Sequence, residues 1–355
     1  MIPRPKVSVL IPTYQYGRFL PEAIESVLAQ DFRDFELIIS DDGSRDDSAA
    51  VIRRYAAQDS RIRFKLRERN LGMVENWNWC LQEARGEYIK FVFGDDCLPS
   101  PQALSRLVAM LEAEPRAVLA VSARFILNEA SQVLEIWDEL GQSGYQEGSD
   151  VIIRCMKQDR NLVGEPSTVL FRRAAAVRGF DGSFRQVVDQ EMWFHLLASA
   201  GLVYTSEPLC AFRRHPAQQT VVNEKHRVAS SEVMRIVARY FYFFALSVGL
   251  KPKSFAMRRR IFRHLYYSRK DCPQAALADI AEATLMPHVT RRWYFVCWLI
   301  HRATKPFVNL RRFLAGRPRP RDFAPAAVPP RAGSIAPVAA GRMSAGGIFP
   351  AESKR

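Results

Sequence analysis

Two adjacent carboxylates, Asp95 and Asp96, follow directly after an apolar run over residues 88–93. Neighbouring carboxylates repel each other unless a cation lies between them. Hard divalent ions such as Mg²⁺ or Mn²⁺ bind through one or two carboxylates and take water and phosphate oxygens as their remaining ligands. The pair therefore predicts a divalent-cation site. The alternative is a capped turn before the helix that Pro99 introduces.

Two other apolar runs also end in residues that could bind a ligand. The first ends in Pro12, Thr13 and Tyr14, and the second in Asp41 and Asp42, which begin the sequence Asp-Asp-Gly-Ser. An exposed tyrosine offers a face on which a nucleobase stacks, and an aspartate can accept the N3 hydrogen of uracil or thymine. An ordinary turn and helix N-cap is the alternative for Asp-Asp-Gly-Ser, because these residues are typical of turns.

The elements that position these clusters alternate between short β-branched runs and segments of helical period. We expect an α/β fold with a mostly parallel sheet and helices on both faces, in which ligands bind beyond the carboxyl ends of the strands. The polar clusters that follow these strands then lie at the same edge of the sheet. The expected strands are 7–12, 35–40, 62–66, 88–93 and 117–121, and the expected helices are 20–28, 48–57, 73–84 and 102–112.

Beyond residue 125 the alternation weakens. The pattern predicts a loop over 141–148, and helical period reappears over 150–158 and 189–200. Short strands are expected at 167–171, 202–204 and 209–212. We therefore divide residues 1–225 into halves at 125/126, followed by a helical region over 226–315 and a disordered tail over 316–355 that is rich in Pro, Ala and Gly.

Composition and charge bound the class of protein. The chain has 355 residues, 48% of them hydrophobic and 25% charged, which is typical of a folded globular protein. Residues 1–224 carry 26 Lys and Arg against 31 Asp and Glu, whereas residues 225–321 carry 21 against 4. Any argument from net charge for an anionic partner therefore applies to the C-terminal third. The 6 scattered cysteines form no metal-binding pair and favour reduced thiols in the cytosol.

The basic third interleaves cations with aromatic residues. Its longest uncharged runs, 240–250 and 293–300, are shorter than the roughly 20 residues of a spanning helix, and the N-terminus lacks the apolar core of a secretory signal. Basic helices with aromatic faces can lie in the interface of an anionic membrane. A helical bundle with its own aromatic core and a nucleic-acid-binding surface are the alternatives.

Several motifs in order resemble the nucleotide-sugar-binding half of the family-two glycosyltransferases of the GT-A fold. They are VSVLIPTYQYGRFLPEAIESVLAQDFRDFELIISDDGSRDDS, NLGMVENWN and GEYIKFVFGDDCLPSPQAL. The resemblance covers residues 1–125 densely and 160–215 more loosely. It implies that Tyr14 stacks on the base and that Asp42 reads its N3 hydrogen. It also implies that Asp95 and Asp96 match the metal-binding DxD motif, with Mg²⁺ or Mn²⁺ held chiefly by Asp96.

The acceptor side of that family is similar to VDQEMWFHLLASAGLVYTSEPLCAFRRHP. Aligned on Trp193, Asp189 takes the position of the family's catalytic base and Glu191 follows on the same helix, while Val188 stands where a Glu is usual. A carboxylate that opens a helix is otherwise an N-cap. The resemblance also implies that His215 reaches the metal or the diphosphate. Its alternative is a surface position in a loop.

The expected activity is transfer of a sugar, with inversion, from a UDP- or dTDP-sugar to a hydroxyl of a glycan or lipid-linked acceptor in cell-surface polysaccharide biosynthesis. The expected location is cytoplasmic, peripheral at the inner face of an anionic membrane, with no nucleic acid bound. Two alternatives remain. A nucleotidyltransferase would be expected to carry a Gly-rich phosphate loop where this chain has PTYQYGR. A non-catalytic anion-binding protein on a degenerate transferase domain is the other.

Overall fold

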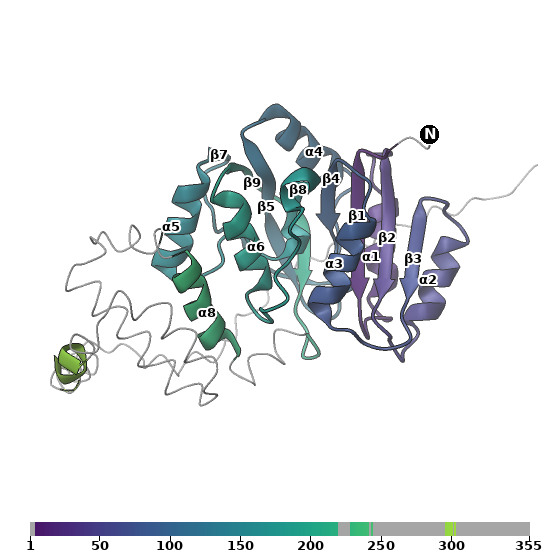
Figure 1. The fold of residues 1–355 in the computed structure, drawn as a ribbon. Coiled ribbons are helices and arrows are strands. Elements are labelled where there is room, and N and C mark those ends of the chain that lie inside the picture. The colour runs from purple at the N-terminus through teal and green to yellow at the C-terminus, as the bar shows by residue number, and fades with distance from the viewer. Residues whose placement is uncertain (1–3, 219–227, 241–242, 244–294, 301, 303–355) are drawn as a thin grey trace, which may run out of the picture.

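The computed structural model describes residues 4–218, 228–240, 243, 295–300 and 302. Its centre is one mixed sheet with helices packed on both sides (Figure 1). The strands are β1 Val7–Thr13, β2 Phe35–Asp41, β3 Ile62–Leu66, β4 Tyr88–Phe91, β5 Ala117–Leu127, β6 Val133–Trp137, β7 Gly144–Gln146, β8 Val169–Arg172 and β9 Gly201–Arg213.

The helices follow the strands in the order that the sequence predicts. Among the described residues, no helix combines the length and apolar character needed to cross a membrane. The helices are α1 Leu20–Leu28, α2 Ser48–Ala56, α3 Met73–Glu83, α4 Ala103–Ala113, α5 Gly148–Gln158, α6 Val188–Leu197 and α8 Val228–Arg239.

The strands lie in the order β3-β2-β1-β4-β8-β5-β9-β7, with β6 paired to the far end of β5. Strands β3, β2, β1 and β4 pair with one another in parallel, and β5 pairs in parallel with β9. Strand β8 is antiparallel to both β4 and β5 and separates them. The expected parallel sheet with helices on both faces is therefore confirmed, with antiparallel strands added by the second half of the chain.

Alternate residues of each central strand face opposite sides of the sheet, and each side has its own apolar core. On β1, Leu10 belongs to one core, while Val9 and Ile11 belong to the other. The core around Leu10 takes residues from α3, α5, α6 and α8, and the other takes residues from α1, α2 and α4. Both faces are thereby shielded from water, which leaves the strand ends as the place where polar groups gather.

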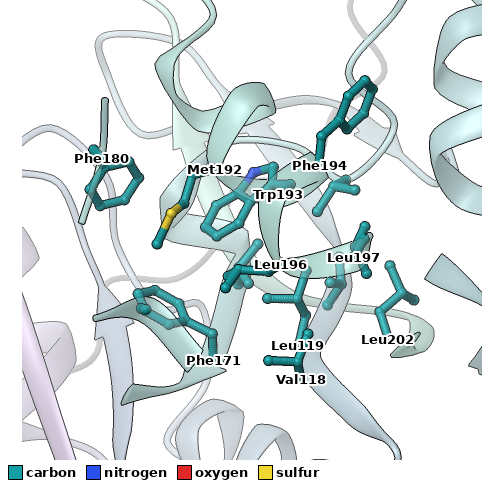
Figure 2. Close-up of a cluster of buried hydrophobic side chains, with 14 of the residues drawn as sticks. Val118, Leu119, Phe171, Phe180, Met192, Trp193, Phe194, Leu196, Leu197 and Leu202 are labelled. Atoms are coloured by element: carbon teal, nitrogen blue, oxygen red, sulfur yellow. The ribbon is translucent and has the colours of Figure 1, made fainter. Parts of the chain in front are cut away.

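Helix α6 is fixed in the core by Trp193, which is fully buried. Figure 2 shows this indole among the rings of Phe171 and Phe180, whose centroids lie 5.9 and 6.4 Å from its own. Its Nε1 donates a hydrogen bond of 2.8 Å to the carbonyl of Gly164. The polar atom of a large buried side chain is thus paired, and the position of α6 is tied to the loop that contains Gly164.

Three expectations for the second half of the chain need correction. The predicted loop over 141–148 contains strand β7, and strand β6 was not predicted at all. Both are short, and two of the three β7 residues are partly buried. The expected strands 202–204 and 209–212 are one continuous β9 whose middle contains exposed polar residues. Strand β9 pairs with β5 on both sides of that polar stretch, and Ser206 and Glu207 bulge out of the ladder between the Ser122–Thr205 and Ala123–Pro208 pairs. Local hydrophobicity does not reveal that the two paired parts form one strand.

The predicted boundaries between domains stay predictions. Most of the basic region 226–315 and all of the tail 316–355 lie outside the described residues. Helix α8, at the start of that region, packs against the core that contains α6 (Figure 1). Cys80, Cys97, Cys155 and Cys210 are free and buried, as expected for small apolar side chains, and Cys297 is buried as well.

Candidate active site

The register of three parallel strands brings the predicted polar clusters together. Thr13 pairs with Asp41 at the carboxyl ends of β1 and β2, and Asp42 donates its backbone N–H to the Thr13 carbonyl at 3.0 Å. On the other side of β1, the N–H of Val92 donates to the carbonyl of Leu10 at 2.9 Å. The turn that contains the next carboxylate pair therefore begins beside the end of β1.

Tyr14 is the exposed residue at this edge. Its side chain is 42% accessible, whereas Pro12 and Thr13 before it are buried in the strand. A large aromatic ring exposed beside buried polar groups fits the predicted stacking platform for a base. Pro12 and Thr13 place that ring by fixing the end of β1.

The two carboxylates of the Asp-Asp-Gly-Ser sequence have different roles: Asp41 stabilises the turn, and Asp42 is the candidate ligand-binding residue. Asp41 accepts hydrogen bonds from the N–H and hydroxyl of Ser44 and so closes the turn. Gly43 has a φ of +78°, and a Cβ there would lie 2.7 Å from the carbonyl carbon of Arg69. The Asp42 carboxylate is instead hydrogen-bonded to the loop before α3. The predicted turn therefore forms, but it uses Asp41 and leaves Asp42 free of it.

Asp42 joins the end of β2 to the loop before α3. Its Oδ1 accepts the N–H of Leu71 at 3.0 Å and its Oδ2 accepts the N–H of Gly72 at 2.9 Å. Each carboxylate oxygen can accept a second hydrogen bond, so base recognition is compatible with this geometry. Arg67, which the sequence did not single out, brings its Nε to 3.8 Å from Asp42 Oδ1, with its guanidinium 5.4 Å from the ring of Trp79.

Arg213, which is 1% exposed, forms hydrogen bonds to both residues of the Asp95-Asp96 pair. Its backbone N–H donates to Asp96 Oδ1 at 3.0 Å, and its Nε donates to the Asp95 carbonyl at 2.8 Å. The remaining guanidinium nitrogens bond to Glu22 and to Ser131. Arg213 is thus a buried structural residue, neither a phosphate ligand nor a solvated cation, and it fixes the turn that presents both carboxylates.

His215 lies in the loop after β9, beside the Asp95-Asp96 turn, and is buried. Its Nε2 is 3.0 Å from Asp95 Oδ2, and its ring packs 4.9 Å from Phe19 and 5.3 Å from Tyr16. The alternative of a surface loop position is wrong. The predicted contact with a metal or a diphosphate stays a prediction, and in this geometry it would act beside Asp95.

The carboxylate pair fits the divalent cation that the fold family implies. Oδ2 of Asp96 is buried and has no hydrogen-bond partner within the described part of the chain. Burial, and then the charge of Asp95, raise the pKa of Asp96 well above its usual range, as expected for a carboxylate that lacks its counter-charge. The described residues contain no cluster of three or more His, Cys, Asp or Glu suited to a metal. Two carboxylates would supply part of the shell of a hard divalent cation, and water and phosphate oxygens would supply the rest.

Asp189 occupies the first turn of α6 without capping it. The N-cap position belongs to Val187, and Asp189 Oδ1 instead accepts the N–H of Gln190 at 2.8 Å. Its Oδ2 accepts a hydrogen bond of 3.0 Å from Asn161 Nδ2, which also donates to the Gly164 carbonyl at 3.1 Å. Burial raises the pKa of Asp189 to about 7. This carboxylate can therefore exchange a proton near neutral pH.

The segment 161–168 links Asp189 to the carboxylate pair. Asn161 at its start holds Asp189, and Ser167 near its end accepts the N–H of Phe93 at 3.1 Å. Between them, the charge of Glu165 contributes to raising the pKa of both Asp96 and Asp189. The segment 161–168 therefore contacts Asp189 at one end and the residues just before Asp95 at the other.

Glu191, the other carboxylate on α6, is fully buried in an ion-pair cluster. Arg178 donates to both of its oxygens at 2.9 and 2.6 Å, and Arg239 and Tyr240 donate to Oε1. Although burial alone would raise it, these donors lower the pKa of Glu191. A carboxylate with strong donors on both oxygens is a poor proton acceptor, which leaves Asp189 as the candidate base on this helix.

Comparison with known proteins gives this arrangement a family. The family model described as Glycosyl transferase family 2 matches residues 8–178. An uncharacterized protein of Mycobacterium tuberculosis, MT1568, is 31% identical over 224 residues, which cover 60% of this chain and 68% of that protein. The chain belongs to glycosyltransferase family 2.

Another relative carries a specific name. The GalNAc(5)-diNAcBac-PP-undecaprenol beta-1,3-glucosyltransferase of Campylobacter jejuni is 41% identical over 105 residues, which are 29% of this chain. The match spans only 34% of that enzyme. The identity is therefore confined to a part of each protein.

Two solved structures share the fold of this glycosyltransferase. TarS residues 1–349 of S. aureus, crystallised with UDP-GlcNAc, match with a TM-score of 0.59 at 19% identity, over 81% of this chain and 82% of TarS. The mannosyltransferase PcManGT of Pyrobaculum calidifontis, in complex with GDP-Man and Mn²⁺, matches with a TM-score of 0.51 at 16% identity, over 84% of this chain and 87% of PcManGT. At these identities the likeness establishes the GT-A fold alone.

Gly94, just before the Asp95-Asp96 pair, packs closely against Thr13 at the end of β1 in this glycosyltransferase. A Cβ at Gly94 would lie 2.5 Å from Thr13 Oγ1 and 2.9 Å from Thr13 Cβ. We expect Gly94→Ala to lower the free energy of unfolding by about 1–3 kcal/mol, as overpacking does, and to weaken UDP binding. Urea denaturation and calorimetry measure the two effects. Gly182→Ala is the matched control, because its Cβ would meet no atom within 4 Å, and equal results for both variants would contradict the packing argument.

Proposed function

We propose that this glycosyltransferase transfers a sugar from a UDP- or dTDP-sugar to a hydroxyl of a glycan or lipid-linked acceptor, with inversion, in cell-surface polysaccharide biosynthesis. The observation that carries the proposal is the convergence at one sheet edge of an exposed Tyr14, the buried Asp42 and the Asp95-Asp96 pair, with the segment 161–168 in contact both with Asp189 and with Phe93 just before that pair. The undecaprenol-linked substrate in the name of the Campylobacter relative supports a lipid-linked acceptor.

The donor half of the site suits a pyrimidine nucleoside diphosphate. Tyr14 offers its exposed face to the base, while Asp42, held by two backbone N–H groups, presents a fixed acceptor for the N3 hydrogen. Asp41 fixes the turn beside it through Ser44. The UDP-GlcNAc bound in TarS, which shares this fold, supports a UDP-sugar.

Asp95 and Asp96 are the residues that would hold Mg²⁺ or Mn²⁺, with His215 beside Asp95. When bound, the cation supplies positive charge that stabilises the departing diphosphate. Arg213 keeps the two carboxylates in place through their backbone and through Asp96 Oδ1. The Mn²⁺ in the complex of PcManGT supports this assignment.

Asp189 is the proposed general base of a single displacement. Its carboxylate takes the proton of the acceptor hydroxyl as that oxygen bonds to the anomeric carbon, while the bond from this carbon to the diphosphate oxygen breaks. The oxygen attacks from the face opposite the leaving group, so the configuration inverts. Asn161 holds one carboxylate oxygen and thereby sets the direction of the other.

The deciding experiment incubates the full chain with a panel of nucleotide sugars and Mg²⁺ or Mn²⁺ and measures release of nucleoside diphosphate with lipid-linked and glycan acceptors. We expect turnover with UDP- or dTDP-sugars. Asp189→Asn should lower the rate of transfer by about 10² to 10⁴-fold and leave donor affinity nearly unchanged, because only proton transfer is lost. A variant that retains its rate would exclude Asp189 as the base.

The pH dependence of transfer follows from the raised pKa of Asp189, about 7. A general base must be ionised, so kcat/KM should rise with pH up to about 7 and fall about tenfold for each unit below it. Glu165→Gln removes a negative charge that contributes to this raised pKa, and it should move the profile to lower pH. A rate that stays constant between about pH 5 and 7 would contradict the assignment.

The cation assignment predicts a loss of metal response in Asp96→Ala. Calorimetric titration of UDP into the wild type should show tighter binding when Mn²⁺ is present, and the variant should bind UDP equally with and without it. Asp138→Ala is the control, because this carboxylate accepts a hydrogen bond from Tyr204 on β9, away from the Asp95-Asp96 turn. Unchanged metal dependence in Asp96→Ala would overturn the assignment.

We also propose that the basic region 226–315 holds the enzyme at an anionic membrane surface, on the cytoplasmic side, near a lipid-linked acceptor. Support comes from the 21 Lys and Arg against 4 Asp and Glu over residues 225–321, beside an acidic balance over 1–224. Lysine and arginine near an anionic surface contribute about 1 kcal/mol each.

Co-sedimentation of the full chain with vesicles tests this surface. Binding should require anionic lipid and should weaken as salt is raised, because the attraction is electrostatic. Replacing Arg258, Arg259 and Arg260 by Gln should reduce it, whereas Arg18→Gln, at an exposed position in the acidic half, should not. Binding that is indifferent to lipid charge and salt would remove the membrane role.

A further inference from the structure

Helix α8 lies against the helix that carries the candidate base (Figure 1). Ile236, Val237 and Tyr240 are buried in the core cluster that contains Phe194 and the rest of the α6 core face. The rings of Phe194 and Tyr240 meet edge to face, with centroids 5.5 Å apart. The start of the basic region is therefore part of the packed catalytic unit.

One buried carboxylate of α8 binds the chain just before α6. Glu232 is 4% exposed. Its Oε1 accepts the N–H of Arg185 at 2.7 Å, and its Oε2 accepts those of Gln186 at 2.8 Å and Val187 at 3.1 Å. These consecutive N–H groups have no partner inside a helix, because α6 begins only at the next residue. A single side chain thus accepts hydrogen bonds from three consecutive N–H groups that lead into α6.

The end of α8 binds the same helix one turn further on. Arg239 and Tyr240 both donate to Oε1 of Glu191, at 2.6 and 3.0 Å. Arg239 also bonds to Asp181, and Arg178 holds Glu191 from the other side. Because Glu191 is fully buried and charged, these bonds are of the strong, directional kind.

Asp189 lies between these two attachment points, two residues after Val187 and two before Glu191. We propose that Glu232 is a positioning residue for catalysis: through three backbone N–H groups it fixes the first turn of α6, and with it the direction of the Asp189 carboxylate toward the acceptor. This inference rests on the proposed role of Asp189 as the base.

The physical reason is the precision that proton transfer needs. A general base must lie within hydrogen-bond distance of the hydroxyl it deprotonates, and a displacement of about 1 Å can lower a rate about 10²-fold. The Asp189 side chain is short, so the direction of its carboxylate follows the backbone of the first helical turn. That turn is held from α8, whose described side chains contribute nothing to the predicted donor site.

The primary test is Glu232→Gln in the full chain. Glutamine is nearly the same size but offers one acceptor oxygen, and its amide group would face N–H donors. We expect kcat for transfer to fall at least tenfold, with the donor KM and the affinity for UDP unchanged. Glu207→Gln is the matched control, because this glutamate pairs with Arg106 on the surface, and it should leave kcat unchanged.

A double-mutant cycle separates positioning from general damage. If Glu232 acts through Asp189, adding Glu232→Gln to Asp189→Asn should cost no further activity. Equal loss in both backgrounds, an unchanged kcat in the single variant, or a loss of UDP affinity in parallel with kcat would each overturn the proposal. If Asp189→Asn alone keeps its activity, the proposed base is wrong, which is a separate outcome.

A second variant covers the case in which Glu232→Gln does not fold. Arg239→Gln removes the bonds to Glu191 and Asp181 at a side chain that is 39% exposed, so it should be tolerated. The same pattern is expected: a lower kcat, an unchanged donor KM and no additional effect in the Asp189→Asn background. Any other pattern in this variant would overturn the role of α8 in positioning the base.

Discussion

The structure depends on the parallel pairing of β1 with both β2 and β4. This pairing is an unbroken ladder over seven residues on the β2 side, and it fixes which residues of three separate chain segments end at the same level. A shift of one residue in either ladder would turn Thr13 or Asp41 toward the opposite face of the sheet. The apolar cores on both faces oppose such a shift, because every inward-facing residue of β1 would change sides.

Several buried charges around the site are satisfied by residues from distant parts of the chain. Arg213 at the end of β9 supports the carboxylate turn after β4, and the Arg124 guanidinium is paired with Glu139 and Glu165. Leaving any one of these charges unpaired in the interior would be costly, so each pair fixes its two segments relative to each other. The carboxylates at this edge are buried, whereas Tyr14 is exposed.

Helix α6 both packs in the apolar core and carries a candidate site residue. Its later turns belong to the core through Trp193 and its neighbours (Figure 2), and its first turn carries Asp189. Because α8 holds both the entry of α6 and Glu191, the helix that carries the candidate base is anchored by residues beyond the segment matched by the family model, which ends at 178. The described start of the C-terminal region is thereby connected to the helix that carries the candidate base.

The sequence by itself determined the alternation of strands and helices over residues 7–121 and the placement of Tyr14, Asp42 and Asp96 at strand ends. Those features follow from local hydrophobic period and from motifs of contiguous residues. It could not determine the antiparallel insertion of β8, the continuity of β9, or the roles of Arg67, Glu165 and Glu232. No pattern along the chain marks these residues, because each acts on a partner that only the fold brings near. Glu232 contacts backbone N–H groups more than 40 residues away. Backbone N–H groups are the same in every residue but proline, so the tertiary structure alone decided that contact.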